Sequence, residues 1–509
     1  MEGQASEVEC VGRESKRLVV VLLCVATAIY IASSVGFALT KRPWCDEAWF
    51  ANPGYNLMTR GVMSTSVLAD CGPPGGIWQG MAQHTYWQPP LSFLAQCAWY
   101  RLFGFSVFSG RGLSVFFGLM LIASAFVLLR GLTRSSTIAA LACLGVAIEP
   151  VFARNAADVR MDAMCAALGY AGLAAYVTLR QKRLTVAVLV ANSFVAASAL
   201  THPNGILAFG ALAALVLYLD RARLTGKHVA VAFVPYMLGF AAWGMYIAQD
   251  TKSFAAQFLG NLTSRTGGLT NTLQFWNAIK NQIVENYFAN WGLGQGGASV
   301  QRLKAIVLLT YAVGIAGIFL ARDLRRHTGY RAVAFLTVLY FVLMALAVRK
   351  TLYNYSIHIV PLLVANAVIF AWWVWQRRRV PRLLTSAYVG ALILLQIGSA
   401  AYSIQSNQYR NLYAPAMAAA RAAWDQHGVV VGSAELGFEF GFDANIKDDI
   451  YLGLYSGLHP AVIYWNDSYE AFYARCAEDE PRVHDHIGKV LAQFRQVYAN
   501  TFYRVYARR

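Results

Sequence analysis

Long uncharged apolar stretches dominate the chain and alternate with short polar loops. The first, from Leu18 to Leu39, is long enough to cross a bilayer as a helix, because about 20 apolar residues span the hydrocarbon core. Ten further stretches follow the same pattern. The sequence therefore predicts a polytopic α-helical membrane protein with about 11 transmembrane helices, at residues 18–39, 112–129, 135–152, 163–179, 184–200, 204–219, 228–248, 305–320, 332–348, 357–375 and 383–404.

Composition supports this class. The chain is 57% hydrophobic and only 14% charged, with a mean hydropathy of +0.43. The net charge of +17 arises mostly from Lys and Arg in short loops on one side of the predicted membrane, so it gives little support to nucleic-acid binding. These basic loops lie at residues 13–17, 130–134, 180–183, 221–227, 322–331 and 377–382.

The positive-inside rule orients the helices. With the N-terminus in the cytoplasm, the basic loops are cytoplasmic, and the C-terminal tail lies outside the cytoplasmic (inner) membrane. The first apolar run is too long for a cleaved signal peptide. We therefore expect an integral protein of the inner membrane with an extracytoplasmic C-terminal part.

The predicted transmembrane unit covers residues 1–404 and contains two long outer segments. The first outer segment, residues 40–111, ends in the run 91–108, which Arg101 and Gly104 interrupt and which we expect to lie at the membrane interface. The second outer segment, residues 249–304, is either a lid over a site or a connector. The tail 405–509 is predicted to be a small α/β domain, with strands at 429–431 and 461–465 and helices at 414–424 and 485–498.

The acidic pair Asp46-Glu47 follows the first predicted helix directly. It is either a solvated loop pair or a site in which one carboxylate faces a substrate while its neighbour orients it. A carboxylate beside the lipid boundary could serve as a general base for transfer to a hydroxyl or an amine.

A second charged cluster lies between the third and fourth predicted helices. If residues 154–165 are helical, Arg154, Asp158 and Asp162 share one face at spacings of four residues. The cluster is either a salt-bridged helix cap or a carboxylate beside a reacting centre, with Arg154 or Arg160 near an anionic group.

Other polar residues of the outer side extend the candidate site. Arg349, Lys350 and Tyr355 suit a lipid phosphate, although cations there also contact headgroups in the ordinary way. His202, in a very short turn, is either a substrate contact or a turn cap. His84 and Tyr86 either line an acceptor groove or sit in the interface. A Cys45–Cys71 disulfide is an alternative to two free thiols.

Taken in order, these motifs resemble the membrane glycosyltransferases of the GT-C superfamily. The similarity is greatest to protein O-mannosyltransferases, lipid A aminoarabinose transferases and dolichyl-phosphate-mannose-type transferases. It rests on Asp46-Glu47-Ala, on Tyr86-Trp-Gln-Pro-Pro-Leu91, on Arg160-Met-Asp162 and on Leu200-Thr-His-Pro-Asn-Gly205, with a looser match at Lys350, Tyr355 and Pro361.

This resemblance implies a GT-C fold and an inverting transfer of a sugar from a polyprenyl-monophosphate donor. The acceptor would be a lipid, a polysaccharide or a protein of the envelope. Asp46 would be the catalytic base and Glu47 its partner; Asp162 or Asp158 would be the second acidic residue. Arg154, Arg160 and Lys350 would hold the phosphate. Some relatives use a divalent metal ion and some do not.

Two other classes of protein compete with this interpretation. A transporter or lipid flippase would carry charges near the membrane midplane and paired half-repeats, neither of which this sequence shows. A non-catalytic subunit of an envelope-assembly complex would use the tail as a binding module, but would have no need of the acidic pair.

Overall fold

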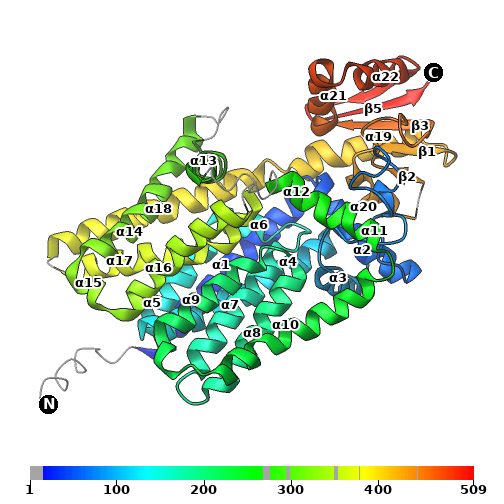
Figure 1. Ribbon diagram of the computed structural model, residues 1–509. Coiled ribbons are helices and arrows are strands. Elements are labelled where there is room, and N and C mark those ends of the chain that lie inside the picture. Colours follow the sequence, from blue (N-terminus) through cyan, green and yellow to red (C-terminus); the bar gives the residue numbers. More distant parts are fainter. Residues whose placement is uncertain (1–14, 267–274, 294–298, 349–352, 378, 444) are drawn as a thin grey trace, which may run out of the picture.

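The computed structural model describes residues 15–266, 275–293, 299–348, 353–377, 379–443 and 445–509. A bundle of long helices forms most of the molecule, and the C-terminal domain lies at the end of the bundle opposite to the start of the first helix (Figure 1). Among the described residues, nine helices are long and apolar enough to cross a membrane, counting the short turns that extend some of them. They are α1 (Lys16–Thr40), α4 (Val107–Thr133), α7 (Asp162–Leu179), α8 (Leu184–Thr201), α9 (Gly205–Asp220), α10 (Gly226–Ile247), α14 (Ala305–Leu320), α16 (Thr328–Leu343) and α18 (Arg379–Gln405).

Two shorter apolar helices, α5 (Ser136–Ile148) and α17 (Val360–Trp375), occupy the two remaining predicted positions. The predicted stretch 135–152 is broken at Glu149 because Pro150 has no backbone N–H and cannot continue the hydrogen-bond ladder. The Glu149 carboxylate caps the short α6 (Pro150–Asn155) by accepting from the Val151 N–H at 3.3 Å. The polytopic helical class is therefore confirmed.

A continuous helix across residues 154–165, considered as one condition for a shared face, does not form. α6 ends at Asn155, α7 begins at Asp162, and turns fill the loop 156–161, where the Arg160 N–H bonds the Asp158 carbonyl at 2.7 Å. Arg154, Asp158 and Asp162 therefore do not share one helical face. Tertiary partners hold Asp158 in the loop, and a periodicity argument cannot take such contacts into account.

The first outer segment contains α2 (Cys45–Arg60), η1 (Ser66–Leu68) and α3 (Leu91–Phe103). Asp46 and Glu47 lie in the first turn of α2, where the helix dipole favours negative charge. α3 buries Phe93 and Tyr100 while it exposes Leu102 and Phe103, a pattern typical of a helix that meets lipid. The following helix, α4, begins at Val107, earlier than predicted.

The second outer segment begins with α11 (Thr251–Phe254), η3 (Ala255–Leu259) and α12 (Gly260–Thr266), which lie against the first outer segment (Figure 1). Gln257 joins the two: its amide donates to the carbonyls of Gln79 at 2.8 Å and His84 at 3.0 Å, and it accepts from the Tyr86 N–H at 2.7 Å. The remaining helical elements are η2 (Arg221–Arg223), α13 (Phe275–Asn281), η5 (Gln282–Phe288), η6 (Ser299–Lys304), α15 (Arg322–Arg326), η7 (Met344–Val348) and η8 (Tyr353–His358).

The tail forms a five-stranded sheet in the order β2-β1-β3-β5-β4, in which β1 runs parallel to β2 and β3, and β5 runs antiparallel to β3 and β4. The strands are β1 (Val429–Gly432), β2 (Ile446–Lys447), β3 (Pro460–Asn466), β4 (Phe494–Ala499) and β5 (Tyr503–Arg508). The helical elements are η9 (Tyr409–Tyr413), α19 (Ala414–Ala423), η10 (Ala434–Leu436), α20 (Gly437–Phe440), α21 (Asp467–Asp479) and α22 (Pro481–Leu491). The helix expected at 485–498 is wrong in its second half, because α22 ends at Leu491 and β4 pairs with β5.

The two faces of this sheet belong to different cores. Val431 and Ile463 pack with residues of α21 and α22, whereas Val430 and Val462 share a cluster with α19 and with Ala48 of α2. Alternate side chains of a strand point to opposite faces, which explains this division. The tail is therefore packed onto the first outer segment.

Polar contacts reinforce this packing. Trp49 of α2 donates to Asp448 at 2.7 Å, and the Lys447 ammonium donates to the Ser66 carbonyl at 2.9 Å. Cys45 and Cys71 are free thiols in the structure, so the disulfide considered for them is absent.

Two carboxyl groups of the tail, those of Glu435 and Asp448, are buried. Burial raises the pKa of Glu435 to about 7 and the pKa of Asp448 to about 6. The folded protein therefore holds a proton that the unfolded chain releases at lower pH. This contribution to stability is complete below pH 4.5 and is lost as the pH rises to about 7.

Ionisation of Glu435 should lower the free energy of unfolding of the native protein by about 3 kcal/mol between pH 4.5 and pH 8. We predict that Glu435→Gln does not show this decrease, because the amide cannot ionise. Thermal unfolding followed by tryptophan fluorescence at both pH values measures the effect. The matched control is Glu478→Gln on an exposed position of α21. An unchanged pH slope in Glu435→Gln would contradict the prediction.

Candidate active site

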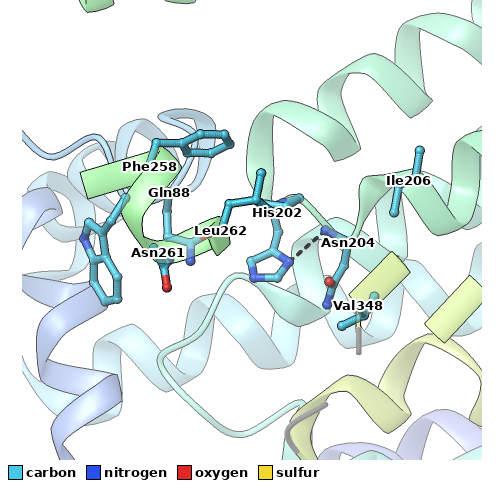
Figure 2. Close-up of a pocket in the computed structure, with 10 residues that line it drawn as sticks. Gln88, His202, Asn204, Ile206, Phe258, Asn261, Leu262 and Val348 are labelled. Carbon is cyan, nitrogen blue, oxygen red and sulfur yellow. Dashed lines mark hydrogen bonds between the residues drawn. The ribbon is translucent and has the colours of Figure 1, made fainter. Parts of the chain in front are cut away.

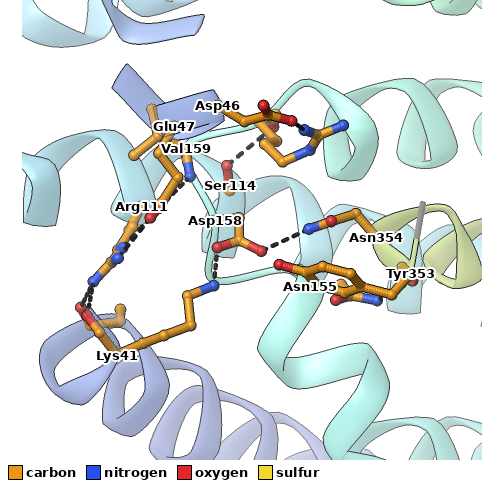
Figure 3. A network of polar contacts seen from close by, with 12 residues as sticks. Lys41, Asp46, Glu47, Arg111, Ser114, Asn155, Asp158, Val159, Tyr353 and Asn354 are labelled. Atoms are coloured by element: carbon orange, nitrogen blue, oxygen red, sulfur yellow. Dashed lines mark hydrogen bonds and ion pairs between the residues drawn. The ribbon is translucent and has the colours of Figure 1, made fainter. Parts of the chain in front are cut away.

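Glu47 is buried in a two-pronged ion pair. Its carboxylate accepts from Arg111 of α4 at 2.9 and 2.7 Å and from the Val159 N–H at 2.9 Å (Figure 3). Arg111 also donates to the carbonyls of Ala38 at 2.7 Å and Lys41 at 2.9 Å, at the end of α1. Burial alone would raise the pKa of Glu47, but the charge of Arg111 outweighs it and lowers that pKa. Glu47 is therefore an ionised, buried group that links α2 with α4 and with the loop 156–161.

Asp158 is also sealed inside the protein. It forms an ion pair with Lys41 and accepts from the Asn354 amide at 2.7 Å (Figure 3). Its side chain is 0% exposed. Of the two aspartates considered as the second acidic residue, Asp158 is thus the one fully paired by a lysine and an amide.

Arg160 joins the other two carboxylates. Its guanidinium pairs with Asp46 and donates to Asp162 at 2.8 Å, and its Cζ lies 4.9 Å from the centre of the Phe50 ring. Burial alone would lower the pKa of Arg160, but Asp162 and Asp46 raise it, so the group stays charged. Asp162 begins α7, which directs it back toward this guanidinium.

Exposure separates the four carboxylates. The Asp46 side chain is 16% exposed, compared with 1% for Asp162 and 0% for both Glu47 and Asp158. Asp46 is therefore the carboxylate of this cluster that a substrate can reach without rearrangement of the protein.

The cluster is a poor fit for a metal ion. Each of the four carboxylates forms an ion pair with a lysine or an arginine, so a cationic side chain already balances its charge. Across the part of the chain that the structure describes, no group of three or more His, Cys, Asp or Glu could hold a metal.

A partly enclosed pocket lies beside the cluster. It is bounded by the first outer segment, by the turn between α8 and α9, by η3 and α12, and by the end of η7 (Figure 2). Its lining residues are Trp87, Gln88, His202, Pro203, Asn204, Ile206, Phe258, Asn261, Leu262 and Val348. His202 both caps its turn, since its Nδ1 accepts from the Asn204 N–H at 3.0 Å, and lines the pocket.

Two aromatic contacts connect this pocket with the cluster. The Trp87 ring stacks on Phe50 with centroids 4.9 Å apart, and Phe50 in turn lies beneath Arg160. On the other side, the His202 ring lies 5.5 Å from the ring of Tyr355, which is buried. The predicted residues Asp46, Arg160, Asp162, His202 and Tyr355 are thus brought together.

His84 and Tyr86 lie outside the lining of this pocket. Tyr86 is buried and donates its hydroxyl to the Tyr246 carbonyl at 3.0 Å, and His84 stacks on it at 5.4 Å. These contacts hold α10 and the second outer segment against the first. The contacts of His84 and Tyr86 are therefore packing contacts between segments, and the two roles considered for these residues stay predictions.

Two further basic residues, Arg154 and Lys304, lie on the side of the bundle that carries the cluster. Arg154 is exposed, with its Cζ 5.7 Å from the centre of the Tyr353 ring, and Lys304 lies within electrostatic range of Arg154. Arg349 and Lys350 lie outside the described residues. The sequence analysis did not identify four residues of this region, which are Lys41, Arg111, Lys304 and Asn354. For Arg111, a signal was available, because a single arginine near the start of an apolar helix is unusual.

We predict that Arg111→Leu destabilises the protein by about 3–5 kcal/mol, because it leaves the Glu47 charge buried without a partner. The matched control is Arg60→Ala, which removes an exposed ion pair between α2 and Asp443 and should cost less than about 1 kcal/mol. Thermal unfolding of both variants, and of the double variant Glu47→Leu with Arg111→Leu, measures the difference. Equal losses in the two single variants would contradict the buried role.

No family model matches the sequence, and no curated relative does. Solved structures match over almost the whole chain. ArnT from Cupriavidus metallidurans bound to undecaprenyl phosphate aligns with a TM-score of 0.59 at 15% identity, covering 97% of this chain and 98% of that one.

The oligosaccharyltransferase of Archaeoglobus fulgidus in complex with zinc and sulfate aligns with a TM-score of 0.57 at 12% identity, covering 96% and 73% of the two chains. AglB from the same organism, in complex with an inhibitory peptide and a dolichol-phosphate, gives 0.53 at 11%, covering 97% and 74%. These proteins are members of the GT-C superfamily, and the chain described here has the GT-C fold.

Proposed function

We propose that the protein is an inverting glycosyltransferase that moves a sugar from a polyprenyl-monophosphate donor to an envelope acceptor on the outer membrane face. The acceptor class, whether lipid, polysaccharide or protein, stays open. The fold supports the proposal, since ArnT was solved with undecaprenyl phosphate and AglB with a dolichol-phosphate and a peptide.

The observation that carries the proposal is the partial exposure of the Asp46 carboxylate. It is the most exposed member of a cluster whose other carboxylates are sealed by cations, and the Phe50 ring beneath its partner Arg160 stacks on Trp87 of the pocket lining. In the proposed reaction, Asp46 accepts the proton of the acceptor hydroxyl or amine. Glu47 and Arg111 hold the first turn of α2 so that this carboxylate keeps its direction.

The displacement has one step. The acceptor oxygen or nitrogen attacks the anomeric carbon, the bond from that carbon to the phosphate oxygen breaks, and its electron pair stays on the phosphate. A single displacement inverts the anomeric centre. Negative charge grows on the phosphate, so nearby cations stabilise the transition state more than the ground state.

Arg160 is suited to this part of the reaction because its charge persists inside the protein. A phosphate that bonds to Arg160 would compete with Asp46 for the same guanidinium and thereby free the carboxylate for the acceptor. Arg154 and Lys304 lie farther out, where they could guide the phosphate from the membrane surface. No step is assigned to a metal ion.

We predict that Asp46→Asn lowers sugar transfer by about 100-fold or more, because the amide cannot accept the proton. Purified protein is offered radiolabelled polyprenyl-phosphate mannose, glucose or aminoarabinose with envelope extracts. Asp443→Asn, an exposed aspartate of the tail, is the control that should keep full activity. Equal transfer by Asp46→Asn and the native chain would remove Asp46 from catalysis. No transfer by the native chain with any donor would favour a non-catalytic subunit or a transporter.

We also predict that Arg154→Gln and Lys304→Gln each raise the KM for the donor about 10-fold with little change in kcat, since each removes a cation that attracts the phosphate. Arg326→Gln in α15, in one of the loops predicted to be cytoplasmic, is the matched control. Initial rates at varied donor concentration give both constants. A fall in kcat alone would contradict a role in donor binding.

A further inference from the structure

We propose that the pocket beneath η3 and α12 binds the sugar ring of the donor and selects a neutral, hydroxyl-rich sugar over a sugar that carries an amine or a carboxylate. The inference rests on the proposed transfer from a polyprenyl-phosphate donor, and it names the class of sugar.

Three buried polar atoms in the pocket wall have no hydrogen-bond partner among the described residues. They are Trp87 Nε1, Gln88 Oε1 and Asn204 Nδ2. The three residues are 7%, 2% and 4% exposed, respectively. A buried polar group without a partner is unfavourable, so each of these atoms would gain from a ligand that forms a hydrogen bond with it. Three such atoms around one cavity indicate a ligand that supplies the missing partners.

The types of these atoms define the ligand. Two are N–H donors and one is a carbonyl acceptor, and a hydroxyl group can satisfy either kind because it both donates and accepts. Phe258 and Leu262 add apolar surface beside them, which suits the C–H groups of a sugar ring (Figure 2). The wall therefore matches a polyol with one apolar side.

The absence of charged residues from the described lining limits the class of sugar further. None of the ten described lining residues is Asp, Glu, Lys or Arg. The Nδ1 of His202 already accepts the Asn204 N–H. Asp162, which lies within electrostatic range of His202, is already bonded to Arg160. An ammonium or carboxylate group on the sugar would be buried with no counter-ion among these lining residues, which is unfavourable.

Position agrees with this assignment. The stack of Trp87 on Phe50, with Arg160 on the same Phe50 ring, brings the pocket wall to the guanidinium that pairs with Asp46. A sugar held by Trp87, Gln88 and Asn204 would therefore direct its anomeric end toward Arg160 and Asp46. The contacts of Gln257 keep the roof of the pocket in place.

Binding measurements test the inference separately from transfer. Asp46→Asn serves as the background, so that no donor is consumed. Titration calorimetry in detergent compares bare polyprenyl phosphate with the same lipid carrying mannose or glucose, aminoarabinose, or glucuronic acid. We expect a neutral sugar to tighten binding about 10-fold over the bare lipid, and the two charged sugars to give no gain.

Variants in the pocket identify the source of that gain. Gln88→Leu and Asn204→Ala should each reduce it to about 3-fold or less and leave the affinity for bare lipid unchanged, whereas Gln493→Leu, an exposed amide of the tail, should change neither. Gln88→Glu should make the lipid that carries aminoarabinose bind more tightly than the bare lipid, because the new carboxylate supplies the missing counter-ion.

Three results would overturn the inference. They are equal binding of charged and neutral sugars by the native pocket, no gain from any sugar, or an equal effect of Asn204→Ala on bare lipid. The last result would assign the pocket to the lipid phosphate. A sugar-dependent gain in a protein that transfers nothing would support the pocket and reject the proposed reaction.

Discussion

The buried ion pair between Glu47 and Arg111 fixes the outer end of the helical bundle. Both side chains are 0% exposed, and together they also bond the end of α1 and the Val159 N–H. Leaving either charge unpaired there would be costly, so α1, α2, α4 and the loop 156–161 must assemble as one unit. The position of Asp46 follows from this assembly, because it precedes Glu47 in the same helical turn.

The surrounding charges are arranged before any substrate arrives. Arg160 stays charged between Asp46 and Asp162, and Lys41 neutralises Asp158. Fixed charges that need no reorganisation during a reaction stabilise developing charge more effectively than water does. The same arrangement leaves one carboxylate, Asp46, partly accessible.

The tail and the second outer segment complete this end of the molecule. One face of the tail's sheet shares a hydrophobic cluster with α2, and Gln257 attaches α11, η3 and α12 to the first outer segment. The GT-C neighbours share the arrangement of helices at 11–15% identity, which is too low to transfer individual residues. The chemistry of the site must therefore be argued from the side chains of this chain.

The sequence by itself determined the membrane helices, because an apolar run of sufficient length has few alternatives to a spanning helix. It also indicated the acidic pair and the GT-C resemblance. Only the tertiary structure decided which carboxylate is accessible, since Glu47 meets Arg111 across 64 residues and Asp158 meets Asn354 across 196. For the same reason, the break before Asp162 and the strand β4 depend on contacts with distant segments, which local periodicity does not record.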